Sequence, residues 1–376
     1  MIPLLLTVLL AGDGPRIVAL ETPAGARQPQ VGVSRTTRHV EGTRFDATVV
    51  DVYVVCGTKD AVHVSVSRDG GESFEPARKI GDVGALALGL RRGPRIALAG
   101  EALVVTAIAG AKGGGQDEDV LAWHSTDRGA SWTYDGRVNE VAAAAREGLH
   151  ALAGGPKGEL FCAWIDVSKE GPRICGASSS SDSLGRWSET RVVFGEPDGI
   201  CPCCHPSAAF DAKGRLFVMW RGHDGGSRDM VVATSDDLGA TFTKPAKLGE
   251  GTWKLEACPM DGGAIVFGGG RLRSVWRRES QIFRAETTGA ERPIGEGEQP
   301  SLAFAPDGEY DAWLARRGGA LLLLRPRASE PIRLDEQASD PVLATGVSVH
   351  APVYAAWESG PVAEPRIVVA RVDARR

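Results

Sequence analysis

The sequence lacks the features that would indicate a membrane or a nucleic acid as partner. After its first dozen residues it contains no apolar run long enough to span a bilayer, so no transmembrane segment is expected in the mature chain. Its 43 lysines and arginines and its 48 aspartates and glutamates give a net charge of −5, and neither sign forms a long block. Without a basic patch, nucleic-acid binding is not expected.

The first residues have the composition of a signal peptide. Residues 1–11 are almost entirely apolar, and Gly12, Asp13 and Gly14 follow as a processing region. A buried first strand is the alternative. We expect residues 1–14 to be removed on export and residues 15–376 to form one periplasmic or secreted domain. No cysteine follows the apolar run in the position that lipid attachment requires, so a lipid anchor is not expected.

A turn motif recurs four times along the chain. It occupies residues 67–74, 125–132, 180–187 and 235–242, so its starts lie 58, 55 and 55 residues apart. The third copy keeps the serine, the aspartate and the aromatic residue but moves the glycine by one place. The aspartate is suited to accept hydrogen bonds from the turn backbone, and the glycine to adopt a positive φ. The motif is therefore a folding device, and we assign it no catalytic role.

These turns resemble the Asp-box, or BNR, repeat of sialidase-like proteins. The resemblance implies an all-β fold, a β-propeller of four-stranded blades, and a carbohydrate as ligand. Apolar strands that end in tryptophan would be the second strands of blades, and the apolar segments before them the innermost strands. Counted this way the chain has seven blades, with six blades, as in sialidases, as the alternative. The tryptophans are Trp164, Trp220, Trp276, Trp313 and Trp357.

The last predicted blade has too few strands at the C-terminal end of the chain. Residues 366–371 would form its third strand, and residues 16–20 could supply the fourth. Closing the ring with an N-terminal strand removes the exposed sheet edges that favour aggregation. A closed ring needs no partner, so we expect a monomer.

The loops that enter the innermost strands and the loops that follow the second strands lie on one face of a propeller, here called the mouth. Arg92 or Arg95, Arg221 and Arg277 come from three blades and could grip a carboxylate, like the arginine triad of sialidase-fold enzymes. An acidic glycan is the expected ligand, although each arginine alone could equally be a salt-bridged loop residue. The candidate ligand-binding residues are Arg92, Arg95, His150, Arg221, His223, Arg228 and Arg277, and the candidate catalytic carboxylates are Asp166, Asp229, Asp261, Glu279 and Glu358.

Hydrolysis of the exo-α-sialidase type requires further residues. The resemblance implies a tyrosine nucleophile at the mouth, but Tyr53, Tyr310 and Tyr354 fall in predicted second strands and Tyr134 follows a repeat turn. The arginine-isoleucine-proline motif of sialidases is absent. A glycosidase or lyase that uses a carboxylate pair is the chemical alternative, and a ligand-binding scaffold without chemistry is another.

The chain has seven cysteines, an odd number. Four of them lie just before the predicted inner strands of two neighbouring blades. The odd count leaves at least one thiol that is free, binds something or pairs with another chain. One interpretation is disulfide bonding among the four, as export favours, with Cys162 and Cys175 as a separate bridge. A second is a copper or zinc site with His205, Met260 or His150. A third is haem c on the pattern Cys201-x-x-Cys204-His205. The four cysteines are Cys201, Cys203, Cys204 and Cys258.

Overall fold

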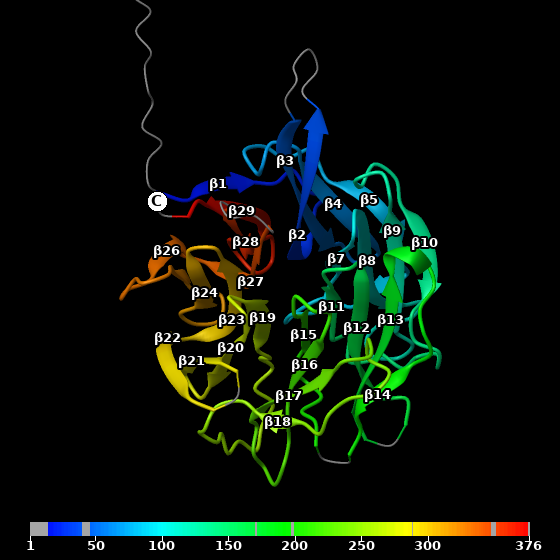
Figure 1. Cartoon of the computed structure of the whole chain (residues 1–376), viewed down its shortest axis with the longest axis vertical. Helices are drawn as coiled ribbons and strands as arrows, with labels where there is room; N and C mark the ends of the chain where they lie inside the picture. The colour runs from blue at the N-terminus through cyan, green and yellow to red at the C-terminus, as the bar shows by residue number, and fades with distance from the viewer. Residues whose placement is uncertain are drawn as a thin grey trace, which may run out of the picture.

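Seven antiparallel sheets form a closed ring, as the colour sequence around Figure 1 shows. The structure is a computed structural model that describes residues 14–39, 46–169, 171–196, 199–287, 289–346 and 351–374. The predicted seven-bladed propeller is confirmed, and the six-bladed alternative is wrong. Residues 1–13 of the predicted signal peptide lie outside the described residues.

Each blade takes its strands from consecutive segments of the chain. Blade one contains β2 (Arg27–His39), β3 (Asp46–Gly57), β4 (Ala61–Ser67) and β5 (Arg78–Asp82). Blade two contains β7 (Arg95–Ala99), β8 (Ala102–Gly110), β9 (Asp119–Ser125) and β10 (Thr133–Arg137), and the short β6 (Ala85–Leu86) also pairs with β8. Blade three contains β11 (His150–Gly154), β12 (Glu159–Asp166), β13 (Arg173–Ser180) and β14 (Arg191–Phe194). Blade four contains β15 (Ser207–Phe210), β16 (Leu216–Arg221), β17 (Met230–Ser235) and β18 (Ala246–Lys247); blade five contains β19 (Ala264–Gly268), β20 (Arg271–Arg278), β21 (Gln281–Glu286) and β22 (Glu291–Glu296); blade six contains β23 (Glu298–Ala305), β24 (Gly308–Leu314), β25 (Leu321–Leu324) and β26 (Ile332–Asp335).

Blade seven joins the two ends of the chain. Its strands are β27 (Ala338–Thr345), β28 (Val353–Ser359), β29 (Arg366–Val372) and the N-terminal β1 (Arg16–Ala19). β1 pairs antiparallel with β29, with Arg16 opposite Arg371 and Ala19 opposite Val368. Figure 1 shows β1 beside β29 at the outer edge of the ring. The predicted closure by an N-terminal strand is therefore confirmed.

The tryptophan at the end of each predicted second strand fills the gap to the preceding blade. Trp164 on β12 packs against Ile108 and Val120 of blade two. Trp313 on β24 packs in the same way against Val275 and Ile282 of blade five. Such large buried side chains contribute much of the apolar area that holds neighbouring blades together. The inner strands of adjacent blades also contact one another all the way around the ring.

In blades one to four, the repeat turns join the third and fourth strands at the end of the blade opposite the mouth. In the second copy, the Asp127 carboxylate accepts hydrogen bonds from the backbone N–H and the hydroxyl of Ser131, at 2.9 and 2.5 Å, while Gly129 has a φ of 80°. These hydrogen bonds lower the pKa of Asp127 to about 2. The first and fourth copies form the same network around Asp69 and Asp237.

The third copy, in which the glycine is displaced, folds differently. It forms a single turn of 3-10 helix, Ser181–Ser183 (η1), in which the Ser183 hydroxyl accepts from the Ser180 N–H. Among the described residues, no helix has the length and apolar character needed to cross a membrane.

Candidate functional site

A ring of buried polar residues lies at the mouth of the propeller; we call it the mouth ring. Three of its members, Gln28, Gln299 and Asp340, each precede a proline at the start of an inner strand and adopt φ values of 56°, 52° and 49°. The pairing register of each strand shifts at this point, so the polar residue leaves the regular alternation of the strand. The mouth ring consists of Gln28, Arg91, Asp261, Gln299, Asp340 and Glu358, which are all buried.

Hydrogen bonds run around the mouth ring from blade to blade. The Gln299 side chain donates to Asp340 Oδ1 at 3.2 Å and accepts from the Asp340 N–H at 3.0 Å. The Gln299 N–H donates to Asp261 Oδ2 at 2.8 Å. On the other side, the Gln28 N–H donates to Glu358 Oε1 at 2.8 Å. Blades one, five, six and seven are therefore linked through side chains at the mouth.

Arg91 extends across the ring from blade two. Its guanidinium donates to the carbonyl oxygens of Pro341 and Gln299, both at 2.6 Å, and its backbone N–H donates to Asp340 Oδ1 at 2.9 Å. Its acceptors belong to blades six and seven, and it is only 6 % exposed. Sequence reasoning selected the neighbouring Arg92 and Arg95 and missed Arg91, because three nearby arginines in one loop look equivalent in the sequence.

Two of the three predicted clamp arginines are used for structure. Arg221, at the end of β16, donates to the carbonyl oxygens of Asp261, Arg228 and Arg277 at 2.7 to 3.0 Å. Among the described residues, Arg95 donates only to carbonyls of its own loop, including that of Pro94 at 3.0 Å. Buried loop carbonyls need donors that no strand supplies, and a guanidinium offers five. The predicted clamp of Arg95, Arg221 and Arg277 therefore requires a correction.

Arg277 is the clamp arginine that reaches solvent. It is at the end of β20, with its side chain 19 % exposed, and Nη1 lies 3.4 Å from Glu298 Oε2. Arg317, from the loop after β24, contacts the same oxygen at 3.5 Å. Arg277 also lies over the ring of Trp253, with its guanidinium carbon 5.7 Å from the ring centroid. The open part of the mouth thus has two arginines that share one carboxylate.

The other predicted basic ligands are also occupied by backbone groups or buried. Arg92 Nε donates to the Glu147 carbonyl at 2.8 Å, and Arg228 Nε donates to the Leu255 carbonyl at 3.2 Å. His150 is fully buried and shares a 3.0 Å hydrogen bond with the Thr106 hydroxyl. Burial, with Arg95 nearby, holds the pKa of His150 well below its usual value. His223 is half-buried in the loop after β16.

Only two of the five predicted catalytic carboxylates belong to the mouth ring. Asp166 binds Arg173 at 2.9 Å at the end of β12, Asp229 binds Lys247 at 2.9 Å, and Glu279 is an exposed turn residue. Asp261 and Glu358 remain. Burial raises the pKa of Asp261, whose Oδ1 has no hydrogen-bond partner among the described residues. Burial, with Asp340 nearby, raises the pKa of Glu358 to about 7.

None of the four tyrosines is placed at the mouth. The Tyr53 hydroxyl donates to Asp51 at 3.1 Å, and the Tyr354 hydroxyl donates to the Gly70 carbonyl at 2.8 Å, both near the repeat turn of blade one. The Tyr310 hydroxyl contacts Asp307 at 2.8 Å. Tyr134 is exposed on the outer strand β10. A tyrosine nucleophile of the sialidase type is therefore not available at the mouth of the described structure.

Three cysteines at the entrance of blade four form a thiol cluster. The Sγ atoms of Cys201, Cys203 and Cys204 lie 3.3, 3.7 and 3.9 Å apart. A disulfide has an S–S distance of about 2.0 Å, so the predicted disulfides within this cluster are not formed. Cys258 is exposed, and its contact with Cys203 raises its pKa. Cys162 also faces Ala177 rather than Cys175, and all seven cysteines are free.

His205 is separate from the thiol cluster. The three thiols form a group within 4.8 Å of one another that does not include His205. The imidazole of His205 packs closely against Gly262, because a Cβ atom at that position would lie only 2.7 Å from the ring. Burial, with Arg91, Arg95 and Arg221 nearby, holds the pKa of His205 well below its usual value. The predicted participation of His205 in a cysteine metal site is not supported by this geometry.

The predicted haem c attachment does not fit the structure. Covalent attachment requires both cysteines of the pattern to direct their sulfurs at one macrocycle. Cys201 and Cys204 are 0 % and 1 % exposed, and their sulfurs face each other at 3.7 Å. We therefore derive no haem chemistry for this protein.

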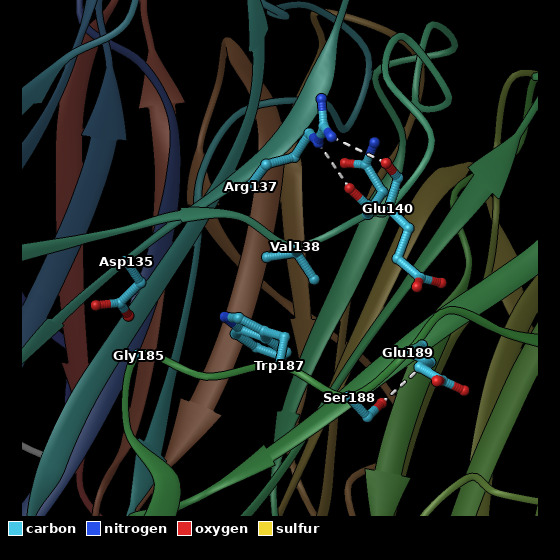
Figure 2. Close-up of a pocket in the computed structure, with 9 residues that line it drawn as sticks. Asp135, Arg137, Val138, Glu140, Gly185, Trp187, Ser188 and Glu189 are labelled. Atoms are coloured by element: carbon cyan, nitrogen blue, oxygen red, sulfur yellow. Dashed lines mark hydrogen bonds between the residues drawn. The ribbon is translucent and has the colours of Figure 1, made fainter.

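Two surface cavities lie away from the mouth. One, of about 360 Å³, is between blades two and three (Figure 2). Figure 2 shows Trp187 pointing toward Val138, between the segment that carries Arg137 and Glu140 and the segment that carries Ser188 and Glu189. The other, of about 410 Å³, is lined by residues of β20 to β24 such as Arg284 and Glu309. Neither includes a residue of the mouth ring or of the thiol cluster.

Comparison with known proteins identifies the fold. No family model and no curated protein matches the sequence. Among solved structures, an α-L-arabinanase from Penicillium chrysogenum has 13 % identity over 96 % of this chain and 99 % of its own, with a TM-score of 0.51. An α-L-arabinofuranosidase from Fusarium graminearum has 12 % identity over 96 % of this chain and 98 % of its own, with a TM-score of 0.53. A Trypanosoma rangeli sialidase has 13 % identity over 79 % of this chain and 56 % of its own, with a TM-score of 0.48. The chain therefore shares the β-propeller fold of the arabinanase and the arabinofuranosidase.

Proposed function

We propose that this protein is an exported β-propeller that binds an acidic carbohydrate at the open part of its mouth. The observation that carries the proposal is the pair Arg277 and Arg317, which share the Glu298 carboxylate at 3.4 and 3.5 Å. A carboxylate of a ligand could replace Glu298, because guanidinium groups bind carboxylates with charge-assisted hydrogen bonds. The likeness to an α-L-arabinanase and an α-L-arabinofuranosidase supports a carbohydrate as the ligand class.

Apart from Glu358, the mouth ring would support this surface rather than form it. Its buried members hold the loops of blades one, two, five, six and seven in place through the hydrogen bonds described above. Arg277 stacks on Trp253, which also lies 5.3 Å from the Arg221 guanidinium carbon. A rigid supporting shell reduces the entropy lost when a ligand binds.

A binding experiment that compares two variants of strand β20 tests the proposal. We expect Arg277→Ala to weaken binding of an acidic oligosaccharide about tenfold, because a charge-assisted contact is lost. Arg271→Ala is the matched control, since Arg271 lies at the other end of β20 and is exposed. The measurement is isothermal titration calorimetry with a panel of acidic and neutral oligosaccharides, arabino-oligosaccharides included. Equal affinity in the two variants, or no binding by the wild type, would contradict the proposal.

Glu358 is the candidate general acid if hydrolysis accompanies binding. Its carboxyl group is 3 % exposed and lies 3.3 Å from Nη1 of the partly exposed Arg27. A pKa of about 7 keeps much of this group protonated at neutral pH, which is the state that a general acid requires. In this proposal, loss of hydrolysis in Glu358→Gln would accompany unchanged binding.

The raised pKa also predicts how stability depends on pH. The folded protein holds a proton on Glu358 that the unfolded chain releases near pH 4.5, so the free energy of unfolding should fall as pH rises from about 4.5 to about 7. Glu358→Gln removes this contribution, so the stability of the variant relative to the wild type should rise by about 2–3 kcal/mol between pH 5 and pH 8. Urea unfolding at both pH values measures it. Exposed Glu336→Gln is the control, and an identical pH dependence in wild type and Glu358→Gln would contradict the assignment.

A further inference from the structure

The thiol cluster has the spacing of metal ligands. Its sulfur–sulfur distances of 3.3, 3.7 and 3.9 Å are too long for disulfides. They match the edges of a coordination tetrahedron, since two sulfurs on one zinc ion with Zn–S bonds of about 2.3 Å lie about 3.8 Å apart. Two of the three thiols are fully buried, so this grouping is not an accident of mobile surface side chains.

The triangle of sulfurs also indicates where an ion would lie. The point equidistant from the three sulfurs in their plane is about 2.1 Å from each, so an ion with bonds of about 2.3 Å would sit about 0.9 Å out of the plane. In a regular tetrahedron the corresponding displacement is about 0.8 Å. The geometry therefore leaves one further coordination position on the side of the ion away from the sulfur plane.

Cys258 is the candidate fourth ligand and marks an entrance; it lies outside the group of three thiols that are within 4.8 Å of one another, so its exposed side chain would turn toward the ion. Cys258, at the head of blade five, contacts Cys203 and is exposed, and Cys203 itself is half-buried. An ion could therefore enter from solvent past Cys258 and Cys203 to reach the buried Cys201 and Cys204.

Nearby positive charge suits a group of thiolates. Arg228, through its charge, favours the thiolate of Cys201, and Arg221 favours that of Cys204. The thiol cluster therefore lies beside two cationic side chains.

We propose that Cys201, Cys203 and Cys204 bind one zinc ion, with Cys258 as the fourth ligand. Binding converts the coordinating thiols into thiolates and releases their protons to the solvent, with no change of oxidation state. Because Cys258 precedes β19 and the other three cysteines precede β15, the ion joins the entry loops of blades four and five. This inference is independent of the carbohydrate proposed above, since the thiol cluster shares no residue with the Arg277 and Arg317 surface.

Zinc fits the sulfur geometry better than copper(I) in a planar three-sulfur site. Planar coordination with bonds of about 2.3 Å requires sulfur–sulfur distances of about 4.0 Å, and the distance between Cys201 and Cys203 is 3.3 Å. The pyramidal arrangement of the three sulfurs, completed by Cys258, would be that of a closed tetrahedral zinc site.

Metal titration of the reduced full-length protein tests the proposal. We expect one equivalent of zinc to bind in competition with a chromophoric chelator, and cobalt(II) to give the sulfur-to-metal charge-transfer absorption of a thiolate site. Cys203→Ser should weaken zinc binding by at least about 100-fold. Cys56→Ala, which removes a buried thiol in blade one, is the control and should bind zinc like the wild type. Zinc should also raise the melting temperature of the wild type but not that of Cys203→Ser.

Three results would overturn the proposal. One is the absence of zinc and cobalt binding by the reduced wild type, which needs no variant and so does not depend on whether Cys203→Ser folds. Another is a disulfide among the four cysteines in protein isolated without reductant, mapped by alkylation and mass spectrometry. The third is an equal affinity for zinc in the wild type and in Cys203→Ser. A failed carbohydrate titration would leave each of these readouts unaffected.

Discussion

Replacing Arg91 by alanine is expected to lower the free energy of unfolding by about 3–5 kcal/mol. The change removes the donors for the carbonyls of Pro341 and Gln299, which are buried beneath the mouth. It also removes the positive charge that lies beside the Asp340 and Asp261 carboxylates. A buried acceptor without a donor and a buried carboxylate without a counter-charge each carry a desolvation penalty. Urea unfolding followed by tryptophan fluorescence measures the loss.

Two further arginine variants show whether the effect is specific to this position. Arg333→Ala removes a side chain that is 57 % exposed and paired with Glu336, and should change stability by less than about 0.5 kcal/mol. Arg91→Lys keeps the charge but cannot reproduce the planar set of donors, so it should recover only part of the loss. An Arg91→Ala protein as stable as Arg333→Ala would show that the mouth ring does not depend on Arg91.

Replacing Asp51 by asparagine is expected to destabilise the opposite face of the propeller by about 2–3 kcal/mol. Asp51 is fully buried, and its Oδ2 accepts hydrogen bonds from Tyr53, Arg68 and Arg128 at 3.1, 3.0 and 2.8 Å. Arg68 belongs to the repeat turn of blade one and Arg128 to that of blade two. The loss of the carboxylate leaves two guanidinium groups without their shared counter-charge, although both are partly exposed and retain some hydration.

The control for this prediction is an exposed aspartate in an equivalent turn. Asp236, in the repeat turn of blade four, is 71 % exposed and pairs with Arg215 at 2.6 Å. Asp236→Asn should change the free energy of unfolding by less than about 0.5 kcal/mol, because exposed ion pairs contribute little. Thermal and urea unfolding of both variants make the comparison. Equal effects would mean that burial of Asp51 does not determine its contribution.

The two positions show that arginine side chains bound to buried acceptors join the blades at both ends. At the mouth, Arg91 and Arg221 donate to loop carbonyls of other blades. At the face of the repeat turns, Arg68 and Arg128 meet on one carboxylate. Several arginines that a sequence would assign to ligand binding therefore hold the ring together, which restricts the proposed ligand surface to the partly exposed Arg277 and Arg317.

The repetition of the fold explains why its architecture could be predicted. The repeat turns and the tryptophans that end the second strands recur with the blades, and the hydrogen bonds of a turn such as that around Asp127 depend on residues within eight positions. The closing strand could be predicted as well, because the last blade lacked a strand that the residues before the first blade could supply. Gln28, Gln299 and Asp340 also share a pattern that is visible in the sequence. Each is a polar residue followed by proline at the start of an inner strand.

The sequence by itself determined the seven blades, their order and the end of each blade at which a polar residue lies, because these follow from local patterns repeated along the chain. Only the tertiary structure decided which side chains meet there. Arg91 rather than Arg92 reaches blades six and seven, His205 is not in the group of thiols that it follows in sequence, and Cys162 faces Ala177. The physical reason is that these contacts depend on side-chain direction and strand register between segments far apart in the sequence, and a shift of one residue reverses the face that each side chain occupies.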